Sequence, residues 1–397
     1  MDQLIEKYRR RLDAVSLDFI RSQEGSIDWD SRLIGIKGAR GTGKTTLLLQ
    51  HLKQHFREDS RALYVSLDNI WFAENSLGEL ADRFIKQGGK YLFLDEVHKY
   101  PNWSNEIKNC YDDYPELQLV FTGSSLLEIL NARADLSRRA IIYRMQGLSF
   151  REYLNLTLGT TFEAISFSDL LQKHEGIARD VNKVLRPLQY FQVYLESGYY
   201  PFFLEGVPLY HQRIEEVVNL IIEIELPMLR NVDIAYASKI KQLLMIIAES
   251  APFIPNITKI SGRIGINRTT LLSYIHYLKE AGLIHTLYRE SSGITRFQKP
   301  EKIFLENTNL AFTFPIPKPD KGTLRETFFM NQLSFSGKVT LPEKGDFLID
   351  GKYSFEVGGK NKTFPSSNTG KYEWIAADDI ETGNGRKVPL WLFGFLY

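Results

Sequence analysis

At 397 residues the chain is long for a single compact core, and its length predicts two or three domains. Hydrophobic residues make up 43% and charged residues 24% of the sequence, a balance that excludes a largely disordered chain. The formal net charge of +1 gives no whole-chain signal for nucleic-acid binding, so a basic surface would have to be local.

The composition predicts a protein of the cytoplasm. The single cysteine, Cys110, excludes an internal disulfide framework and is typical of a reducing compartment. The first residues carry charges where a signal peptide needs an apolar core. No apolar run approaches the roughly 20 residues that span a bilayer, so no membrane partner is expected.

Short apolar runs and helical stretches alternate along the first part of the chain. Residues 1–30 are predicted as an N-terminal helical arm, and a core is predicted over residues 31–155. The predicted strands of the core are 33–36, 62–67, 91–95, 117–122 and 140–143, and its clearest helices are 45–56 and 77–85. This alternation predicts an α/β fold with a doubly wound parallel sheet covered on both faces.

A phosphate-binding loop follows the first predicted strand. The segment matches the pattern G-x-x-x-x-G-K-[ST] in full and opens a predicted helix, which is the context that the motif requires. Its backbone N–H groups would face the phosphates of ATP, Lys44 would reach the β- and γ-phosphates, and the Thr45 hydroxyl would bind Mg²⁺. The alternative is a glycine-rich turn that carries Lys-Thr by chance. The expected nucleotide-binding residues are Gly38, Ala39, Arg40, Gly41, Thr42, Gly43, Lys44, Thr45 and Thr46.

Two carboxylates end the third predicted strand. Asp95 is expected to hold Mg²⁺ opposite Thr45, and Glu96 to orient or deprotonate the attacking water. One strand and one helix fit between Lys44 and Asp95, a spacing that suits ATPases with an extra strand between the two motifs. The alternative is a solvated acidic turn. The run Asp95-Glu96-Val97-His98 also resembles a helicase box, but no second phosphate-binding half follows.

Small polar residues and two arginines complete the expected catalytic set. Thr122 and Ser124 end the fourth predicted strand, where they would contact the γ-phosphate or the water, unless Ser124 merely caps a helix. Arg138 and Arg139 precede the fifth strand and would stabilise charge on the transferred phosphoryl group. A surface ion pair with Asp135 is the alternative for these arginines.

Residues 156–250 are predicted to be mainly helical, and residues 251–298 are predicted as a winged helix. The run from Ile257 to Arg268 resembles the start of a helix–turn–helix, and residues 283–293 suit a wing hairpin. Contacts to duplex DNA are hypothesised for Arg263, Arg268, Thr269 and Lys279. The alternative is a winged helix used for packing or for protein contacts.

Five segments occur in the order typical of one family. They are Ile34-Gly35-Ile36-Lys37, Leu94-Asp95-Glu96-Val97-His98, Phe121-Thr122-Gly123-Ser124-Ser125, Asp135-Leu136-Ser137-Arg138-Arg139 and Leu148-Ser149-Phe150-Arg151-Glu152-Tyr153. Together they resemble prokaryotic AAA-type ATPases, related to the STAND and origin-recognition branch, that carry a C-terminal domain of unknown function. The resemblance implies an ATPase core, a helical lid, a winged helix and a nuclease-like tail.

The tail, residues 299–397, is predicted as a small α+β domain. Its acids Glu326, Asp346 and Glu356 resemble the carboxylate set of the restriction-endonuclease fold. That fold needs a lysine two residues after the last acid, where this chain has Gly358, so Lys360 or Lys362 would have to substitute. The tail is therefore interpreted as a degenerate nuclease fold.

These observations predict a Mg²⁺-dependent ATPase that acts as a nucleotide-dependent switch. Two alternatives stay open: a regulatory nucleotide-gated module that binds DNA or protein without significant turnover, and an ATP-gated nuclease. Duplex DNA and another protein are both candidate partners, and formation of a homo-oligomer is left open.

Overall fold

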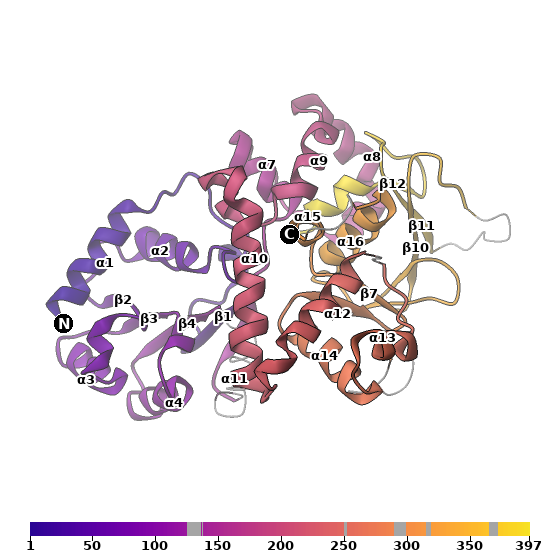
Figure 1. The fold of residues 1–397 in the computed structure, drawn as a ribbon. Helices are drawn as coiled ribbons and strands as arrows, with labels where there is room; N and C mark the ends of the chain where they lie inside the picture. The colour runs from indigo at the N-terminus through magenta and orange to yellow at the C-terminus, as the bar shows by residue number, and fades with distance from the viewer. Residues whose placement is uncertain (125–135, 137, 250–251, 290–298, 315–318, 365–371) are drawn as a thin grey trace. The chain divides into compact units, whose positions relative to one another are not determined.

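The computed structural model describes residues 1–124, 136, 138–249, 252–289, 299–314, 319–364 and 372–397 (Figure 1). The chain forms two compact units, residues 1–147 and residues 148–397. The segment predicted as the N-terminal arm lies within the first unit. The segments predicted as the lid, the winged helix and the C-terminal domain lie within the second.

The first unit is built on a parallel five-stranded sheet with the order β2-β3-β4-β1-β5. Its strands are β1 (Leu33–Lys37), β2 (Ala62–Ser66), β3 (Tyr91–Asp95), β4 (Gln118–Gly123) and β5 (Ile141–Arg144). The register places Ile34 opposite Val120 of β4 and Ile141 of β5. The predicted doubly wound α/β sheet is confirmed.

Helices cover both faces of this sheet, with α1 (Asp2–Ala14) and α2 (Lys44–His55) on one face and α3 (Leu77–Lys86) and α4 (Trp103–Asp113) on the other (Figure 1). Because both faces are covered, the strands are almost wholly apolar, and side chains such as Ile34 and Leu119 are fully buried. This core fixes the strand ends in place.

The position of β4 decides which loops meet. It lies between β1 and β3, as the spacing between the two sequence motifs suggests. In a parallel sheet all the carboxyl ends of the strands share one edge, and a ligand crevice forms where the strand order reverses. The loops after β1, β3 and β4 therefore converge at that edge.

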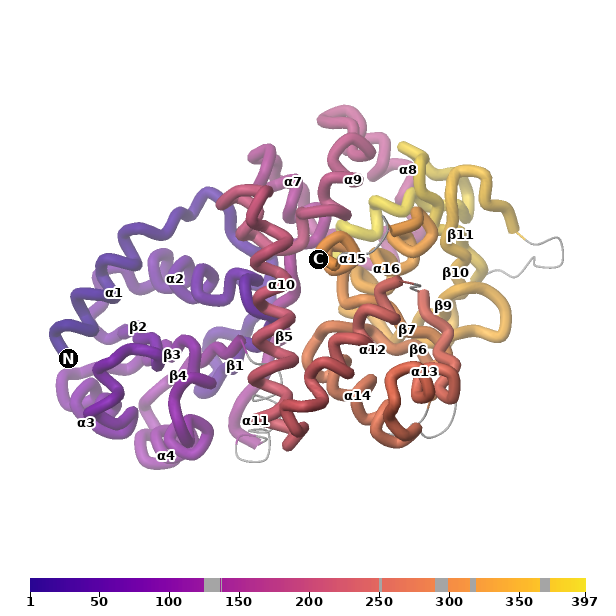
Figure 2. The backbone as a smooth tube through the Cα atoms, in the orientation of Figure 1, coloured from indigo at the N-terminus to yellow at the C-terminus, as the bar shows by residue number. Residues whose placement is uncertain are grey.

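The N-terminal segment lies against α2 (Figure 2). The Gln50 side-chain amide donates hydrogen bonds to the carbonyls of Ser16, at 2.9 Å, and Phe19, at 2.7 Å. The Lys53 ammonium donates to the carbonyl of Val15 at 2.6 Å. Residues 15–31 contain bends and turns and the short 3₁₀ helix Glu24–Ser26, and these hydrogen bonds hold the segment against the helix that follows the phosphate loop.

The second unit is rich in helices. They are α7 (Phe150–Leu158), α8 (Phe167–Val184), α9 (Pro187–Ser197), α10 (Tyr210–Leu220), α11 (Leu226–Arg230), α12 (Ala237–Glu249), α13 (Ile257–Ile264), α14 (Arg268–Glu280), α15 (Thr308–Thr313) and α16 (Lys321–Leu333). Among the described residues, none of the helices has the length and apolar content that crossing a membrane requires.

Two sheets accompany these helices. A hairpin pairs β6 (Ile284–Leu287) with β7 (Lys302–Leu305). A mixed sheet has the order β12-β11-β10-β9-β8. Its strands are β8 (Val339–Thr340), β9 (Phe347–Ile349), β10 (Tyr353–Gly358), β11 (Glu373–Ala377) and β12 (Lys387–Pro389). Helices α7, α8, α9 and α16 share one hydrophobic core with this mixed sheet, through residues such as Phe150, Phe191, Phe329 and Phe355.

Candidate nucleotide site

The loop after β1 has the backbone conformation of an anion cradle. Gly41 and Gly43 have φ angles of 83° and 96°, a left-handed region that favours glycine. A Cβ atom on Gly38 would lie 2.3 Å from the Met145 carbonyl oxygen, so no other residue fits there. Gly43 ends the loop, and α2 starts at Lys44, so the free N–H groups of its first turn are available to phosphate oxygens.

Lys44 is held inside this loop. Its ammonium group donates hydrogen bonds to the carbonyls of Gly38, at 2.8 Å, and Ala39, at 2.9 Å, and only 4% of the residue is exposed. Burial lowers the pKa of Lys44 to about 8, although Glu96 and Asp95 act in the opposite direction. A phosphate group beside this ammonium would stabilise its positive charge, as water does for an exposed lysine. The loop therefore fits the anion that the sequence predicts.

Asp95 is the buried centre of a hydroxyl network. Its carboxylate accepts hydrogen bonds from Thr45, at 2.7 Å, from Tyr64, at 2.7 Å, and from Thr122. All three donors are neutral hydroxyl groups, and only 1% of Asp95 is exposed. The pairing of Thr45 with Asp95 gives the donor set that Mg²⁺ prefers, and the residues fit that ion.

Glu96 lies beside this network in a strained backbone conformation, with a φ angle of 53°. Its carboxylate accepts a hydrogen bond from the Ser124 hydroxyl at 2.7 Å and lies 3.5 Å from Nε2 of His98. Burial lowers the pKa of His98 to about 4, with a smaller contribution from Lys99, so the ring is neutral near pH 7. The structure therefore brings Glu96 and Ser124 together.

Three residues at this site carry no motif signal. Tyr64, on β2, joins Asp95 to Arg11 of α1, whose guanidinium donates to the Tyr64 hydroxyl at 2.7 Å. Burial, and then Asp95, raise the pKa of Tyr64 above its ordinary value. Arg21 donates to the carbonyl of Thr42, at 2.7 Å, and of Gly147, at 2.9 Å. Of the three, only Tyr64 stands out in the sequence, as a polar hydroxyl within the apolar strand β2.

The remaining expected residues of this site lie around it. Thr42 donates from its hydroxyl to the Ala39 carbonyl at 2.9 Å, which closes the loop on itself. Arg40 is partly exposed and its charge helps to lower the pKa of Lys44, whereas Thr46 is exposed on the first turn of α2. These residues remain predicted nucleotide contacts.

The alternative of an ion pair with Asp135 is not tested, because Asp135 is not among the described residues. Arg139 forms an ion pair with Asp112 of α4, with nitrogen–oxygen distances of 2.9 Å, and Arg138 is exposed. Asp135, together with Ser125 and Ser137, lies outside the described residues. A role for either arginine at the transferred phosphoryl group stays a prediction.

The acids predicted for a nuclease site meet in the second unit. Lys302 of β7 lies 3.2 Å from Glu326 and 3.5 Å from Asp346, and it thereby joins α16 to the start of β9. Glu356 of β10 forms an ion pair with Lys362 at 2.6 Å. Burial raises the pKa of Glu326, with an opposing effect of Lys302.

The two lysines after β10 are not equivalent. The Lys362 side chain forms an ion pair with Glu356. Lys360 instead makes a backbone contact, in which its carbonyl accepts a hydrogen bond of 2.5 Å from the Lys387 ammonium. Lys302 was not among the residues predicted for this site, and it lies between Glu326 and Asp346.

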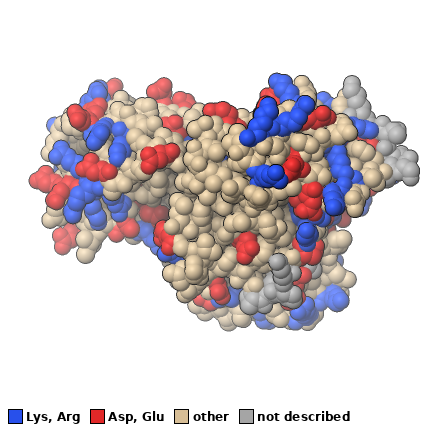
Figure 3. All heavy atoms as spheres, turned by 90° about the horizontal axis from the view of Figure 1, so that it is seen from above, with Lys and Arg blue, Asp and Glu red and all other residues tan. Residues whose placement is uncertain are grey.

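The residues predicted to contact DNA lie on two neighbouring helices. Arg263 is near the end of α13, whereas Arg268 and Thr269 open α14, and all three are exposed. The Lys279 ammonium lies 5.4 Å from the centre of the Tyr288 ring, in a cation–π contact. Figure 3 views the molecule from above Figure 1 and labels no helix; on that face Lys and Arg side chains lie among Asp and Glu side chains.

Comparison with known proteins supports the nucleotide-binding core. Residues 30–154 match the family model described as an AAA domain. The match covers most of the first unit, and the sheet order and the loop geometry there agree with an α/β P-loop core.

Two curated relatives come from Methanocaldococcus jannaschii. The uncharacterised protein MJ1637 is 26% identical over 317 residues, which are 76% of this chain and 66% of that protein. The uncharacterised protein MJ1544 is 26% identical over 144 residues, which are 34% of this chain and 32% of that protein. The chain thus spans less than two thirds of the length of either relative.

Solved structures with a related arrangement are more distant. The Walker-type ATPase PABY2304 of Pyrococcus abyssi is 12% identical with a TM-score of 0.37, covering 78% of this chain and 94% of that one. The ORC1 protein of Aeropyrum pernix, solved in complex with DNA, is 15% identical with a TM-score of 0.30, covering 77% and 90%. Likeness at this level supports no inference about the function of this chain.

Proposed function

We propose that this protein is an ATPase that works as a nucleotide-dependent switch. ATP would bind at the loop Gly38–Thr45 with its phosphates against the start of α2. The chemistry that Mg²⁺ would supply there is positive charge beside the phosphate groups. Thr45 and Asp95 would hold that ion.

The observation that carries the proposal is the hydrogen bond of 2.7 Å between the Thr45 hydroxyl and the Asp95 carboxylate. It joins the phosphate loop to the acidic strand although β4 separates their two strands in the sheet. A Gly-rich turn of chance composition would not require a buried acid at this distance.

Glu96 would act on the attacking water. It lies one residue beyond Asp95, at the same edge of the sheet, and its carboxylate is only partly buried. Ser124 holds one carboxylate oxygen, so release of this hydrogen bond would free Glu96 to act as a general base. We propose that this release, in response to the γ-phosphate, is the switching event.

The test is steady-state ATP hydrolysis by the wild type and by Glu96→Gln, with and without Mg²⁺. We expect the variant to bind ATP as the wild type does and to lose about 100-fold or more in turnover, the range for a general base. Equal turnover in the two proteins would overturn the role of Glu96. If the wild type binds ATP without turnover under any condition, a regulatory nucleotide-gated module is the better account.

A second candidate function is nucleic-acid cleavage by the tail. It is favoured by one observation: acids predicted from three separate segments meet around Lys302 and Lys362. Acids of this kind hold Mg²⁺, and a nearby lysine stabilises the developing negative charge. Plasmid nicking that persists in Lys44→Ala but disappears in Asp346→Asn would support this function. The same nicking in both variants would refute it.

DNA is the partner we propose for α13 and α14. Arg263, Arg268 and Thr269 are exposed on neighbouring helices, and contacts to phosphates would make the affinity fall with salt. Arg268→Ala should weaken duplex binding and reduce the salt dependence. Binding that is unchanged in Arg268→Ala and in Arg263→Ala would leave a protein partner as the alternative.

A further inference from the structure

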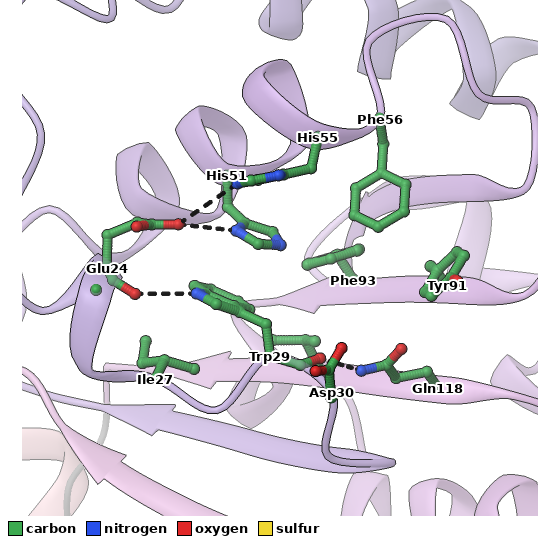
Figure 4. A pocket seen from close by; sticks show the side chains of 12 residues that line it. Glu24, Ile27, Trp29, Asp30, His51, His55, Phe56, Tyr91, Phe93 and Gln118 are labelled. Atoms are coloured by element: carbon green, nitrogen blue, oxygen red, sulfur yellow. Dashed lines mark hydrogen bonds and ion pairs between the residues drawn. The ribbon is translucent and has the colours of Figure 1, made fainter.

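A cavity of about 430 Å³ lies at the other end of α2 from the phosphate loop. Its walls include Tyr91 and Gln118, the first residues of β3 and β4, so it opens at the amino ends of the strands. Aromatic side chains line much of it (Figure 4). This position separates the cavity from the nucleotide site, which lies at the carboxyl ends.

Three potential metal ligands gather on one side of this cavity. Oε1 of Glu24 lies 3.0 Å from Nδ1 of His51 and 3.9 Å from Nε2 of His55 (Figure 4). One ligand atom from each of the three residues can be chosen so that all lie within 4.8 Å of one another. Ligands around a tetrahedral zinc ion at about 2.0–2.1 Å are separated by about 3.3 Å, so the two measured distances bracket the required spacing.

Two local features of the structure bring these side chains together. His51 and His55 are four residues apart on α2, so they project from the same face of the helix. Glu24 begins a 3₁₀ turn, and its carbonyl accepts a hydrogen bond of 3.0 Å from the Trp29 indole. The Trp29 ring in turn stacks on the His51 ring, with 3.7 Å between centres.

The burial of the three side chains suits a site with an open position. The His51 side chain is 7% exposed and Glu24 is 20% exposed, whereas His55 is 54% exposed. Two ligands are therefore pre-positioned, and the exposed His55 ring can rotate to complete the set.

We propose that Glu24, His51 and His55 bind a divalent transition-metal ion, with zinc as the expected occupant. Two imidazoles and one carboxylate match the ligand preference of zinc, and a fourth position is left for water or another ligand. Mg²⁺ prefers oxygen ligands and is not expected here.

The ion would fasten the N-terminal segment to the helix of the phosphate loop. Glu24 lies three residues beyond Arg21, whose guanidinium holds the carbonyl of Thr42 in that loop. His51 and His55 lie about two and about three turns along α2 from Lys44. The metal would thus add a further link between the N-terminal segment and α2, and it should stabilise the folded protein by an amount that grows with the logarithm of its affinity.

Zinc binding to the intact, nucleotide-free protein tests the proposal. After removal of metals, zinc is titrated against a chromophoric chelator in excess Mg²⁺, which occupies oxygen sites. We expect one zinc ion per chain in the wild type and a rise in its thermal unfolding midpoint. His55→Gln should weaken the affinity by more than about 10-fold, since even outer-shell partners of a metal contribute that much.

The matched control is His276→Gln. His276 lies 3.1 Å from Glu280 in an ordinary i,i+4 pair, so its loss removes a histidine–glutamate contact without touching the cavity. Zinc affinity should be unchanged in this variant. Glu24→Gln is the second variant, used if His55→Gln fails to fold. The proposal would be overturned if the wild type did not bind zinc, or if both His55→Gln and Glu24→Gln bound zinc as tightly as the wild type.

Discussion

Buried and partly buried acidic residues have different kinds of polar partner in the two units. In the first unit the Asp95 carboxylate accepts hydrogen bonds from the hydroxyls of Thr45, Tyr64 and Thr122. In the second unit Glu326 and Asp346 share the ammonium group of Lys302. Hydroxyl groups orient a carboxylate without cancelling its charge, whereas an ammonium group cancels it. The first arrangement is thus prepared for a cation, and the second already contains one.

The largest effect is expected from Lys44→Ala. The ammonium lies inside the phosphate loop, and its loss should lower ATP affinity by about 100-fold, as expected for one or two charge-assisted hydrogen bonds. Equilibrium binding of a fluorescent ATP analogue measures this change. The exposed Lys86, paired with Asp82, gives the control Lys86→Ala, which should bind normally. Equal losses in both variants would mean that the loop is not the nucleotide site.

Lys302→Met tests whether the lysine is what keeps the second unit from binding a cation. Removing the ammonium leaves Glu326 and Asp346 without their shared partner, so the free energy of unfolding should fall by about 2 kcal/mol. Mg²⁺ should then restore stability to the variant and have little effect on the wild type. Urea unfolding with and without Mg²⁺ measures both.

The control for this variant is Lys321→Met, which removes an exposed pair with Asp379 and should change stability by no more than about 0.5 kcal/mol. If Mg²⁺ stabilises the wild type as strongly as Lys302→Met, the ammonium does not compete with a cation and the contrast between the units is wrong.

Tyr64→Phe sharpens the comparison within the first unit. The change removes a hydrogen-bond donor from Asp95 and an acceptor from Arg11, which should lower the free energy of unfolding by about 1–2 kcal/mol. Tyr8 offers a matched control, since its ring lies 6.3 Å from that of Tyr64 and its buried hydroxyl has no hydrogen-bond partner among the described residues. Tyr8→Phe should leave stability unchanged or raise it. Equal destabilisation by the two variants would argue against the network.

The smallest effect concerns pH. Because burial lowers the pKa of Lys44 to about 8, the free protein loses this proton as pH rises through 8, whereas an ordinary lysine keeps its proton until about pH 10.5. Phosphate favours the charged ammonium, so ATP binding should take up a proton in that window, and affinity should decline above pH 8. Calorimetry at pH 9 in buffers of different ionisation enthalpy measures the uptake. At pH 7 no uptake by this group is expected, and uptake at both pH values would point to another residue.

Contiguous motifs were the part of the site that could be predicted. The pattern Gly38–Thr45 specifies its own backbone conformation through glycine, and apolar runs specify the buried strands β1, β2, β3 and β4. Asp95 and Glu96 could be placed because an acid after a buried strand must emerge at the carboxyl edge of the sheet.

Other residues could not be assigned because their partners are distant in sequence. Nothing near Tyr64 indicates that its hydroxyl meets Asp95, and nothing near Lys302 indicates that it joins Glu326 to Asp346. The glutamate and the two histidines of the zinc proposal could not be predicted either, since Glu24 and His51 lie in different segments.

By itself, the sequence determined the α/β core, the phosphate loop and the acids that face it, because each depends on local backbone geometry and on the burial of neighbouring apolar residues. Only the tertiary structure decided which polar groups compensate those acids. Such pairing depends on distances between side chains from separate elements, and these distances are set by the packing of the whole unit rather than by any single segment.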